Sequence, residues 1–210
     1  MAESTVLIAG NRNTSSWTLR AWLALRKSGV SFREHWVDLR APDAKEQLNQ
    51  LSPTGLVPVL VHEGDVIWDS LAIAEYASEA FAKGKLWPTD VKRRARARSV
   101  AAEMHSGFVE LRTRMPMNCL GQNLDAELTP ELERDIVRIG AIWQHCLSKS
   151  SGPWLFDQLS IADIMYAPVV FRFRSYGVKL GAVEQAYVRQ WLSDPDLREW
   201  LSLCLQEARG

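Results

Sequence analysis

Apolar and polar residues at the start of the chain follow first a strand pattern and then a helix pattern. Residues 5–10, Thr-Val-Leu-Ile-Ala-Gly, form a short β-branched run that ends at a glycine, which is typical of a buried strand. Residues 16–28 place apolar side chains at helical spacing, and Gly29 follows where a C-cap glycine is expected. Residues 30–39 alternate only in part, and we predict a second strand there.

Further along, the pattern predicts another helix, a β-hairpin and a third helix. Pro42 is acceptable in a first helical turn, so we expect a short helix over residues 42–50. Two short apolar runs, residues 57–62 and 66–68, are separated by Glu-Gly-Asp, which is a hairpin signal. With a helix over residues 70–81, the predicted order is β-α-β-α-β-β-α, which fits an α/β unit.

Beyond this unit the strand signals nearly vanish. A stretch that contains glycine and proline, residues 83–90, separates the α/β pattern from a region of helical periodicity. We therefore predict two domains, an α/β domain over residues 1–82 and an all-α domain over residues 91–210. The predicted helices of the second domain cover residues 91–114, 130–148, 161–173, 182–192 and 196–207.

The composition is that of an ordinary globular protein. Of the 210 residues, 47% are apolar and 24% are charged, which excludes a disordered or collagen-like chain. Lys and Arg together number 25, as do Asp and Glu, so the formal net charge is zero. A neutral chain gives no reason to expect nucleic acid or an anionic membrane as the main partner. We expect a small molecule or another protein instead.

Cysteine and histidine usage argues against a metal centre and a thiol redox motif. The three cysteines lie far apart without a Cys-x-x-Cys, and the four histidines show no metal-ligand spacing. A sparse, odd number of cysteines suits a reducing compartment. The N-terminus lacks the basic region of a signal peptide, and no apolar run approaches the length of a membrane span. We therefore predict a cytoplasmic protein that binds no metal.

Three hydroxyl side chains, Thr14, Ser15 and Ser16, precede or begin the first predicted helix. Ser and Thr are preferred N-cap residues, and this preference alone favours a purely structural cap. The same place also suits an anion, because the free N–H groups and the dipole of a helix start favour negative charge. A hydroxyl here is therefore either a cap or a hydrogen-bond donor to a bound anion.

Two further stretches carry candidate ligand-binding groups. Residues 52–60 place a proline at a strand start, after a Pro-x-Gly turn. If the Val57–Pro58 bond is cis, the preceding peptide turns outward and pairs with a ligand, whereas a trans proline at a strand start is the alternative. Asp69 and Ser70 stand at the start of a predicted helix, where they can cap it and where a ligand carboxylate is also favoured.

Ser160 and Asp163 form a fourth motif, a capping box directly before an apolar run, whose role is structural. The four motifs, in this order, resemble the cytosolic glutathione transferases, and most closely their serine-using bacterial and zeta-like members. The resemblance covers nearly the full length of the chain. It implies a thioredoxin-like N-terminal domain that binds glutathione and an all-helical C-terminal domain that contributes the pocket for the second substrate.

The resemblance implies that Ser15 is the catalytic hydroxyl, with Thr14 and Ser16 as alternative donors. Glutathione would be the co-substrate, and its free thiol titrates near a pKa of about 8.5, so that little of it is thiolate at neutral pH. Lowering this pKa by about two units, worth roughly 2.7 kcal/mol, would make most of the thiol reactive. A hydrogen bond from Ser15 and the helix dipole both act in that direction.

The resemblance also implies how the rest of glutathione is held. Val57 would offer its backbone N–H and C=O to the cysteinyl part, while Pro58 holds the bend. The hydroxyl and N–H of Ser70 would bind the γ-glutamyl carboxylate, and Asp69 would face the ammonium group. Leu56 departs from the family, which often has Lys or Gln there to reach the glycyl carboxylate.

Three polar residues are candidates to bind the glycyl carboxylate in place of the polar side chain that Leu56 lacks. They are Arg12, Lys45 and Gln50, and the sequence does not choose among them. The leading prediction is a homodimeric glutathione transferase. It would activate the thiolate either for conjugation to a small electrophile or for a zeta-like isomerisation. The alternative is a non-catalytic interaction module of the same fold, which the loss of a polar residue at position 56 favours.

A basic run over residues 91–99 is the remaining charged feature. Cations at a helix start are disfavoured by the helix dipole, so the run points at a partner subunit, a nucleic acid or a solvated face. No aromatic residue interrupts it and the chain has no net positive charge, which argues against nucleic acid. We expect a solvated face or a dimer contact.

Overall fold

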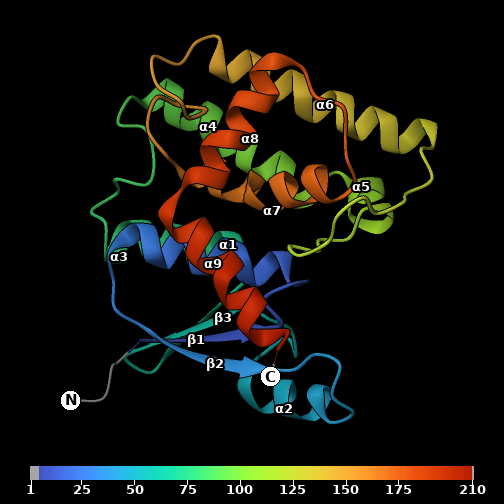
Figure 1. The fold of residues 1–210 in the computed structure, drawn as a ribbon. Helices are drawn as coiled ribbons and strands as arrows, with labels where there is room; N and C mark the ends of the chain where they lie inside the picture. Colours follow the sequence, from blue (N-terminus) through green and yellow to red (C-terminus); the bar gives the residue numbers. More distant parts are fainter. Residues whose placement is uncertain (1–4, 210) are drawn as a thin grey trace. The chain divides into compact units, whose positions relative to one another are not determined.

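The computed structural model describes residues 5–209, which divide into two compact units, one ending at Leu86 and one beginning at Trp87. The first unit is α/β and the second is all-α, as predicted (Figure 1). The assignment of separate glutathione-binding and substrate-pocket roles to residues 1–82 and 91–210 stays a prediction.

The first unit is built on a mixed four-stranded sheet of order β2-β1-β3-β4. β1 pairs parallel with β2 and antiparallel with β3, and β3 and β4 form the predicted hairpin. The element order is the predicted one. The elements are β1 (Thr5–Gly10), α1 (Ser16–Ser28), β2 (Arg33–Val37), α2 (Ala44–Leu51), β3 (Val59–His62), β4 (Asp65–Trp68) and α3 (Ser70–Ala80).

The two faces of this sheet are covered by different helices (Figure 1). On one face Ile8, Val37 and Val59 pack against α2. The contacting residues of α2 are Ala44 and Leu48, which are one helical turn apart and both buried. On the other face α1 and α3 pack against each other and against the sheet. The starts of α1 and α3, which carry the candidate site residues, therefore belong to one layer.

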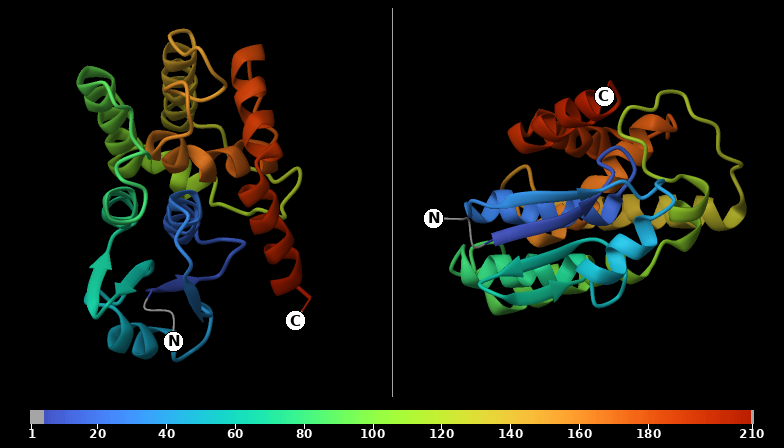
Figure 2. Two further views of the ribbon diagram at one scale, coloured as in Figure 1. Left: turned by 90° about the vertical axis from the view of Figure 1, so that its left-hand side faces the viewer. Right: turned by 90° about the horizontal axis from the view of Figure 1, so that it is seen from below.

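The second unit is a helical bundle around α7, whose side chains are almost all buried and which packs on α4 and α8. Figure 2 shows α8 and α9 following one another along one side of this unit. The elements are α4 (Val91–Ser106), α5 (Val109–Arg114), α6 (Pro130–Leu147), α7 (Ile161–Ser175), α8 (Ala182–Ser193) and α9 (Pro195–Glu207).

The prediction of one helix over residues 91–114 is wrong, because the chain breaks between α4 and α5. Gly107 is extended, and a Cβ built on it would lie 2.8 Å from the carbonyl oxygen of Glu103. Phe108 follows with a left-handed φ of 58° and a buried side chain. Since Phe108 supplies an apolar residue at helical spacing, the periodicity continues across the break.

Two predicted strands are shorter than expected. The run over residues 30–39 forms a strand only between Arg33 and Val37. The run over residues 57–62 begins pairing at Val59, because Pro58 has no N–H to donate to a ladder. The other predicted elements agree with the structure to within two residues at each end.

The predicted capping box at the start of α7 is part of a buried hydrogen-bond network around Asp163. The carboxylate accepts bonds from the N–H and the hydroxyl of Ser160, both at 2.9 Å. It also accepts from the N–H of Leu155 at 2.9 Å and the hydroxyl of Tyr187 at 3.0 Å. Burial raises the pKa of the Asp163 carboxyl to about 6, although these hydrogen bonds act in the opposite direction.

Candidate active site

Ser15 is the N-cap residue of α1 and is buried. Its Oγ accepts a hydrogen bond from the N–H of Thr18 at 3.3 Å and donates to the Oγ1 of Thr18 at 2.8 Å. Thr18 Oγ1 also accepts from the N–H of Gly10, the last residue of β1, at 3.0 Å. The hydroxyl of Ser15 is therefore held at the helix start by Thr18, a residue that the sequence analysis did not single out.

This arrangement determines to which acceptor the hydroxyl of Ser15 can donate. To bond a thiolate, the hydroxyl hydrogen must turn away from Thr18 toward the ligand. That rotation exchanges a bond between neutral groups, worth about 0.5–1.5 kcal/mol, for one to a charged acceptor, worth about 1.5–3 kcal/mol. The exchange favours the thiolate. Thr14 is exposed and Ser16 is the first residue of α1, and both remain alternative donors.

Replacing Thr18 by valine is expected to lower the free energy of unfolding by about 1–3 kcal/mol, because the buried N–H of Gly10 loses its acceptor. Urea unfolding of both proteins measures the difference. Thr14→Val is the matched control, since Thr14 is exposed and the same change there should stay within about 0.5 kcal/mol. A loss of similar size in the two variants would contradict the buried role of Thr18.

The loop between β1 and α1 is anchored to β2 through Glu34. Arg12 of this loop forms an ion pair with Glu34 at 2.8 Å, and its guanidinium lies 3.5 Å from the ring centroid of Trp36. Trp22 and Trp36 donate their indole N–H groups to the same carboxylate, at 2.6 and 2.8 Å. Because its charge is paired with Glu34 and its guanidinium plane lies on Trp36, Arg12 is a poor candidate to reach the glycyl carboxylate of glutathione.

The Val57–Pro58 peptide bond is cis, the geometry that the resemblance implies. β3 pairs with β1 and β4 only from Val59 onward. Val57 is half-buried and precedes both ladders, so neither ladder takes its N–H and C=O. These two backbone groups are the ones that the resemblance assigns to the cysteinyl part of glutathione.

The loop that holds Val57 lies directly against the end of β1. A Cβ built on Gly10 would come within 3.0 Å of the Cγ2 of Val57, which is closer than packed side chains normally stand. The N–H of Gly10 donates to the Oγ1 of Thr18, which also accepts a hydrogen bond from the hydroxyl of Ser15. The structure therefore brings the predicted catalytic hydroxyl and the predicted backbone contact together at the carboxyl end of β1.

Asp69 and Ser70 lie at the start of α3. Asp69 has φ 74° and ψ 132°, a backbone conformation that is costly for a residue with a side chain and that is concentrated at functional sites. Its carboxylate caps the helix by accepting from the N–H groups of Leu71 and Ala72, at 2.8 and 3.2 Å. Ser70 is 1% exposed, and within the described residues its hydroxyl has no hydrogen-bond partner.

The hydroxyl of Ser70 fits a ligand carboxylate for a simple reason. A buried hydroxyl without a partner is destabilising by about 1–3 kcal/mol, and one rotation about its Cα–Cβ bond can direct it to a new acceptor. A carboxylate at the start of α3 would supply that acceptor and would also be favoured by the N–H groups of the first turn. Capping by Asp69 and binding by Ser70 are therefore compatible.

Leu56, which replaces the polar residue of the family, is 64% exposed and has no group that could bind a carboxylate. Lys45, from the first turn of α2, reaches this loop. Its Nζ donates to the carbonyl oxygen of Gly55 at 3.4 Å, and a Cβ built on Gly55 would lie 2.7 Å from the Nζ. Gln50 is exposed. Among the three candidates, Lys45 contacts the loop that carries Leu56.

Family models match both units of the chain. Residues 14–80 match "Glutathione S-transferase, N-terminal domain", and residues 125–202 match "Glutathione S-transferase, C-terminal domain". A probable maleylacetoacetate isomerase from Caenorhabditis elegans is 30% identical over 85% of this chain and 83% of the relative. The chain belongs to the glutathione S-transferase family.

Other relatives and solved structures agree with this membership. A maleylacetoacetate isomerase from Pseudomonas aeruginosa is 32% identical over 81% of this chain and 82% of that protein. The crystal structure of a glutathione transferase homologue from Burkholderia, with bound glutathione, has a TM-score of 0.75 at 21% identity and covers 96% of this chain and 98% of its own. The predicted family, fold class, enzyme class and co-substrate glutathione are confirmed.

The structure describes residues 5–209 of this glutathione S-transferase family member. Within that range, no helix combines the length and the hydropathy that a membrane crossing requires. Nor do His, Cys, Asp and Glu side chains in the same range gather in a group of three that could hold a metal ion.

Proposed function

We propose that this protein uses the thiolate of glutathione to isomerise a carbon–carbon double bond that is conjugated to a carbonyl group, in an unsaturated acid of the maleylacetoacetate type. The observation that carries the proposal is the buried hydroxyl of Ser15 at the N-terminus of α1, where an anion is stabilised. The relatives named as maleylacetoacetate isomerases, which align over more than four fifths of this chain, support isomerisation over conjugation.

The chemistry needs an anionic sulfur at two moments. Addition of the thiolate forms a carbon–sulfur bond and moves the electron pair of the double bond onto the conjugated carbonyl group as an enolate, which leaves a carbon–carbon single bond about which the substrate rotates. Elimination then breaks the carbon–sulfur bond and restores both the double bond and the thiolate. No atom is gained or lost overall. The contribution proposed for Ser15 is to keep the sulfur negatively charged before addition and after elimination, by donating one hydrogen bond. Serine is a weak base, so we assign it no proton transfer.

The rest of the glutathione site is proposed as follows. Val57 pairs its backbone with the cysteinyl part, and Pro58 keeps that backbone turned outward. Ser70 binds the γ-glutamyl carboxylate with its hydroxyl and N–H, and Asp69 faces the ammonium group. The unpartnered hydroxyl of Ser70 and the strained backbone of Asp69 support these roles.

Lys45 is proposed to bind the glycyl carboxylate in place of the missing side chain at position 56. Lys45→Met, which keeps the length of the side chain and removes its charge, should weaken glutathione binding roughly fivefold, since a partly exposed charge pair is worth about 1 kcal/mol. Calorimetric titration with glutathione measures this. Lys85→Met is the matched control at an exposed position of the same unit and should leave the affinity unchanged. Equal affinities in the Lys45→Met and Lys85→Met proteins would exclude Lys45.

Three further properties are proposed together with the activity. The second unit supplies the pocket for the electrophilic substrate, as in the family. A homodimer is supported by β4, an edge strand whose side chains Val66 and Trp68 are 41% and 48% exposed. A cytoplasmic location is supported by three buried cysteines, none of which forms a disulfide within residues 5–209. Light scattering of the purified protein tests the dimer.

The proposed reaction is tested by following maleylacetoacetate by NMR in the presence of the enzyme. We expect isomerisation with catalytic amounts of glutathione, no turnover when glutathione is omitted, and no rescue by S-methylglutathione, which has no free thiol. Conjugation of glutathione to an aryl halide is measured in parallel. Rapid conjugation without isomerisation would contradict the proposed reaction and would indicate a transferase that makes stable adducts.

A further inference from the structure

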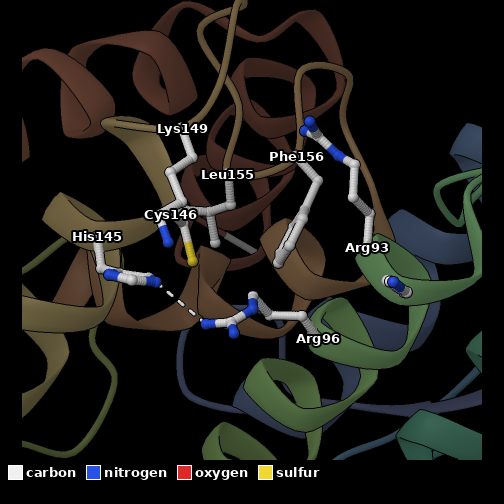
Figure 3. A pocket seen from close by; sticks show the side chains of 8 residues that line it. Arg93, Arg96, His145, Cys146, Lys149, Leu155 and Phe156 are labelled. Carbon is white, nitrogen blue, oxygen red and sulfur yellow. Dashed lines mark hydrogen bonds between the residues drawn. The ribbon is translucent and has the colours of Figure 1, made fainter.

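A cavity of about 230 Å³ lies within the second unit (Figure 3). It is formed by the first turns of α4, the last turn of α6 and the segment that follows α6. It is smaller than the roughly 300–1,000 Å³ typical of pockets for drug-sized ligands. The lining residues are Lys92, Arg93, Arg96, His145, Cys146, Lys149, Leu155 and Phe156.

The inner part of this cavity is apolar. Leu155, Phe156 and Cys146 are 1%, 7% and 4% exposed and form its floor. Burial raises the pKa of the Cys146 thiol to about 11, although the charges of Arg96 and Lys149 act in the opposite direction. The thiol is therefore uncharged at neutral pH and behaves as a small apolar group. A ring or a short hydrocarbon chain suits this floor.

The rim of the cavity is positively charged. Lys92, Arg96 and Lys149 are exposed, and in the described part of the chain none of them forms an ion pair. Arg93 differs, because it is neutralised by Asp157 at 2.7 Å. The rim thus holds three positive charges without an ion-pair partner among residues 5–209, in a protein whose formal net charge is zero.

Arg96 is oriented by His145. Its Nη1 lies 3.0 Å from the Nε2 of His145, as the dashed line in Figure 3 shows. A guanidinium can only donate, so Nε2 is the acceptor in this contact. This contact fixes the direction of the Arg96 side chain without cancelling its charge, which is the arrangement that an anion site needs.

The neighbouring arginines of the basic run have structural contacts instead. Arg94 donates to the carbonyl oxygens of Pro88 and Thr89, at 2.9 and 2.8 Å. Arg98 lies over the ring of Trp87, 5.6 Å from its centroid. The run at the start of α4 is therefore more than a solvated face. It divides into residues that fix the chain before the helix and residues that line the cavity.

We propose that this cavity binds a small organic anion, such as an aryl phosphate, as a second ligand site. The charged group sits among Lys92, Arg96 and Lys149, and the ring rests on Leu155 and Phe156. The carboxylate of Asp90 already caps the start of α4, and a bound anion would relieve the repulsion among the three cations of the rim. An enclosed apolar floor suits a small molecule and is not needed by a nucleic acid, which contacts an open basic surface.

The site is tested by calorimetric titration of phenyl phosphate into the full-length protein. Arg96→Gln combined with Lys149→Gln should raise the dissociation constant at least tenfold. Arg98→Gln removes a charge from the same helix outside the cavity and should change it less than twofold. Inorganic phosphate should bind at least fivefold more weakly than phenyl phosphate, because it cannot use the apolar floor. Saturating S-methylglutathione should leave phenyl phosphate binding unchanged, whether or not the proposed isomerase activity is found.

Four outcomes would overturn this proposal. They are the absence of phenyl phosphate binding at millimolar concentration, an equal loss in the Arg98→Gln protein, inorganic phosphate binding as tightly as phenyl phosphate, and displacement by S-methylglutathione. Thermal melting of each variant checks that it is folded. Lys149→Gln alone, at an exposed position after α6, should still weaken phenyl phosphate binding at least threefold. This single variant tests the site even if the double variant folds poorly.

Discussion

Replacing Ser15 by alanine should lower kcat/KM for the glutathione-dependent reaction on the order of tenfold at pH 7. If the bound thiol has a pKa of about 6.5 and returns to about 8.5, its thiolate fraction at pH 7 falls roughly 25-fold. The more basic thiolate that remains is a better nucleophile, which recovers part of this loss. The loss should grow as the pH is lowered and shrink above the pKa of the free thiol, so steady-state kinetics are measured from pH 6 to pH 9.

Control variants separate catalysis from helix capping. Loss of the N-cap alone destabilises the protein by about 0.5–2 kcal/mol in the alanine variant, whereas Ser15→Gly preserves most of the cap and also removes the hydroxyl. Both variants should show the same kinetic loss. Thr14→Ala and Ser16→Ala should stay within threefold of wild type. A large loss in either of them, with normal rates for Ser15→Ala, would transfer the catalytic role to that hydroxyl.

Replacing Asp163 by alanine should lower the free energy of unfolding by about 3–5 kcal/mol. The carboxylate accepts four hydrogen bonds from Ser160, Leu155 and Tyr187, and its removal leaves these donors buried without an acceptor. Urea unfolding measures the loss. Asp125→Ala, outside any helix and exposed, is the matched control and should change stability by less than about 0.5 kcal/mol.

The stability supplied by Asp163 should depend on pH with a definite sign. Its pKa in the folded protein, about 6, lies above the ordinary value of 3.8 for a solvated aspartate because burial disfavours the charged form. The stabilisation is therefore complete below about pH 4 and is lost as the pH rises through 6. The difference in unfolding free energy between wild type and Asp163→Asn should be larger at pH 4 than at pH 7, by about 2 kcal/mol. Equal differences at the two pH values would contradict the raised pKa.

Much of the fold could be predicted from local sequence patterns, and the main error of that prediction has a physical cause. The order of strands and helices was predictable because each element has a clear period and ends at a turn residue such as Gly29, which adopts a left-handed φ of 79°. The break after α4 was not predictable in this way. Phe108 adopts a positive φ that few residues with side chains adopt, and its burial within the second unit, not its local sequence, stabilises it.

The candidate site was predictable only in part. The proposed roles of Ser15, Val57 and Ser70 came from a family resemblance, since hydroxyls and a proline at element starts are common without it. The part played by Thr18 depends on the end of β1 meeting the start of α1. The choice of Lys45 depends on α2 approaching Gly55. Both are tertiary contacts that sequence spacing does not encode.

The cavity between α4 and the segment after α6 also depends on tertiary contacts that could not be predicted from the sequence. The sequence identified a charged run at residues 91–99 but could not show that Lys149, distant in the chain, shares a cavity with it. Nor could it show which arginines of the run have structural contacts. Only the packing of α4 against the segment after α6 separates Arg96 from Arg98.

The central claim is that the amino end of α1 and the hydroxyl of Ser15 hold the sulfur of glutathione as a thiolate. The most direct test is the pKa of glutathione bound to the protein, read from the ultraviolet absorbance of the thiolate across a pH titration. The account predicts a value about two units below that of free glutathione in the wild-type protein and a return toward the free value in Ser15→Gly. A bound pKa equal to that of free glutathione in the wild type, or the same lowered pKa in both proteins, would contradict it.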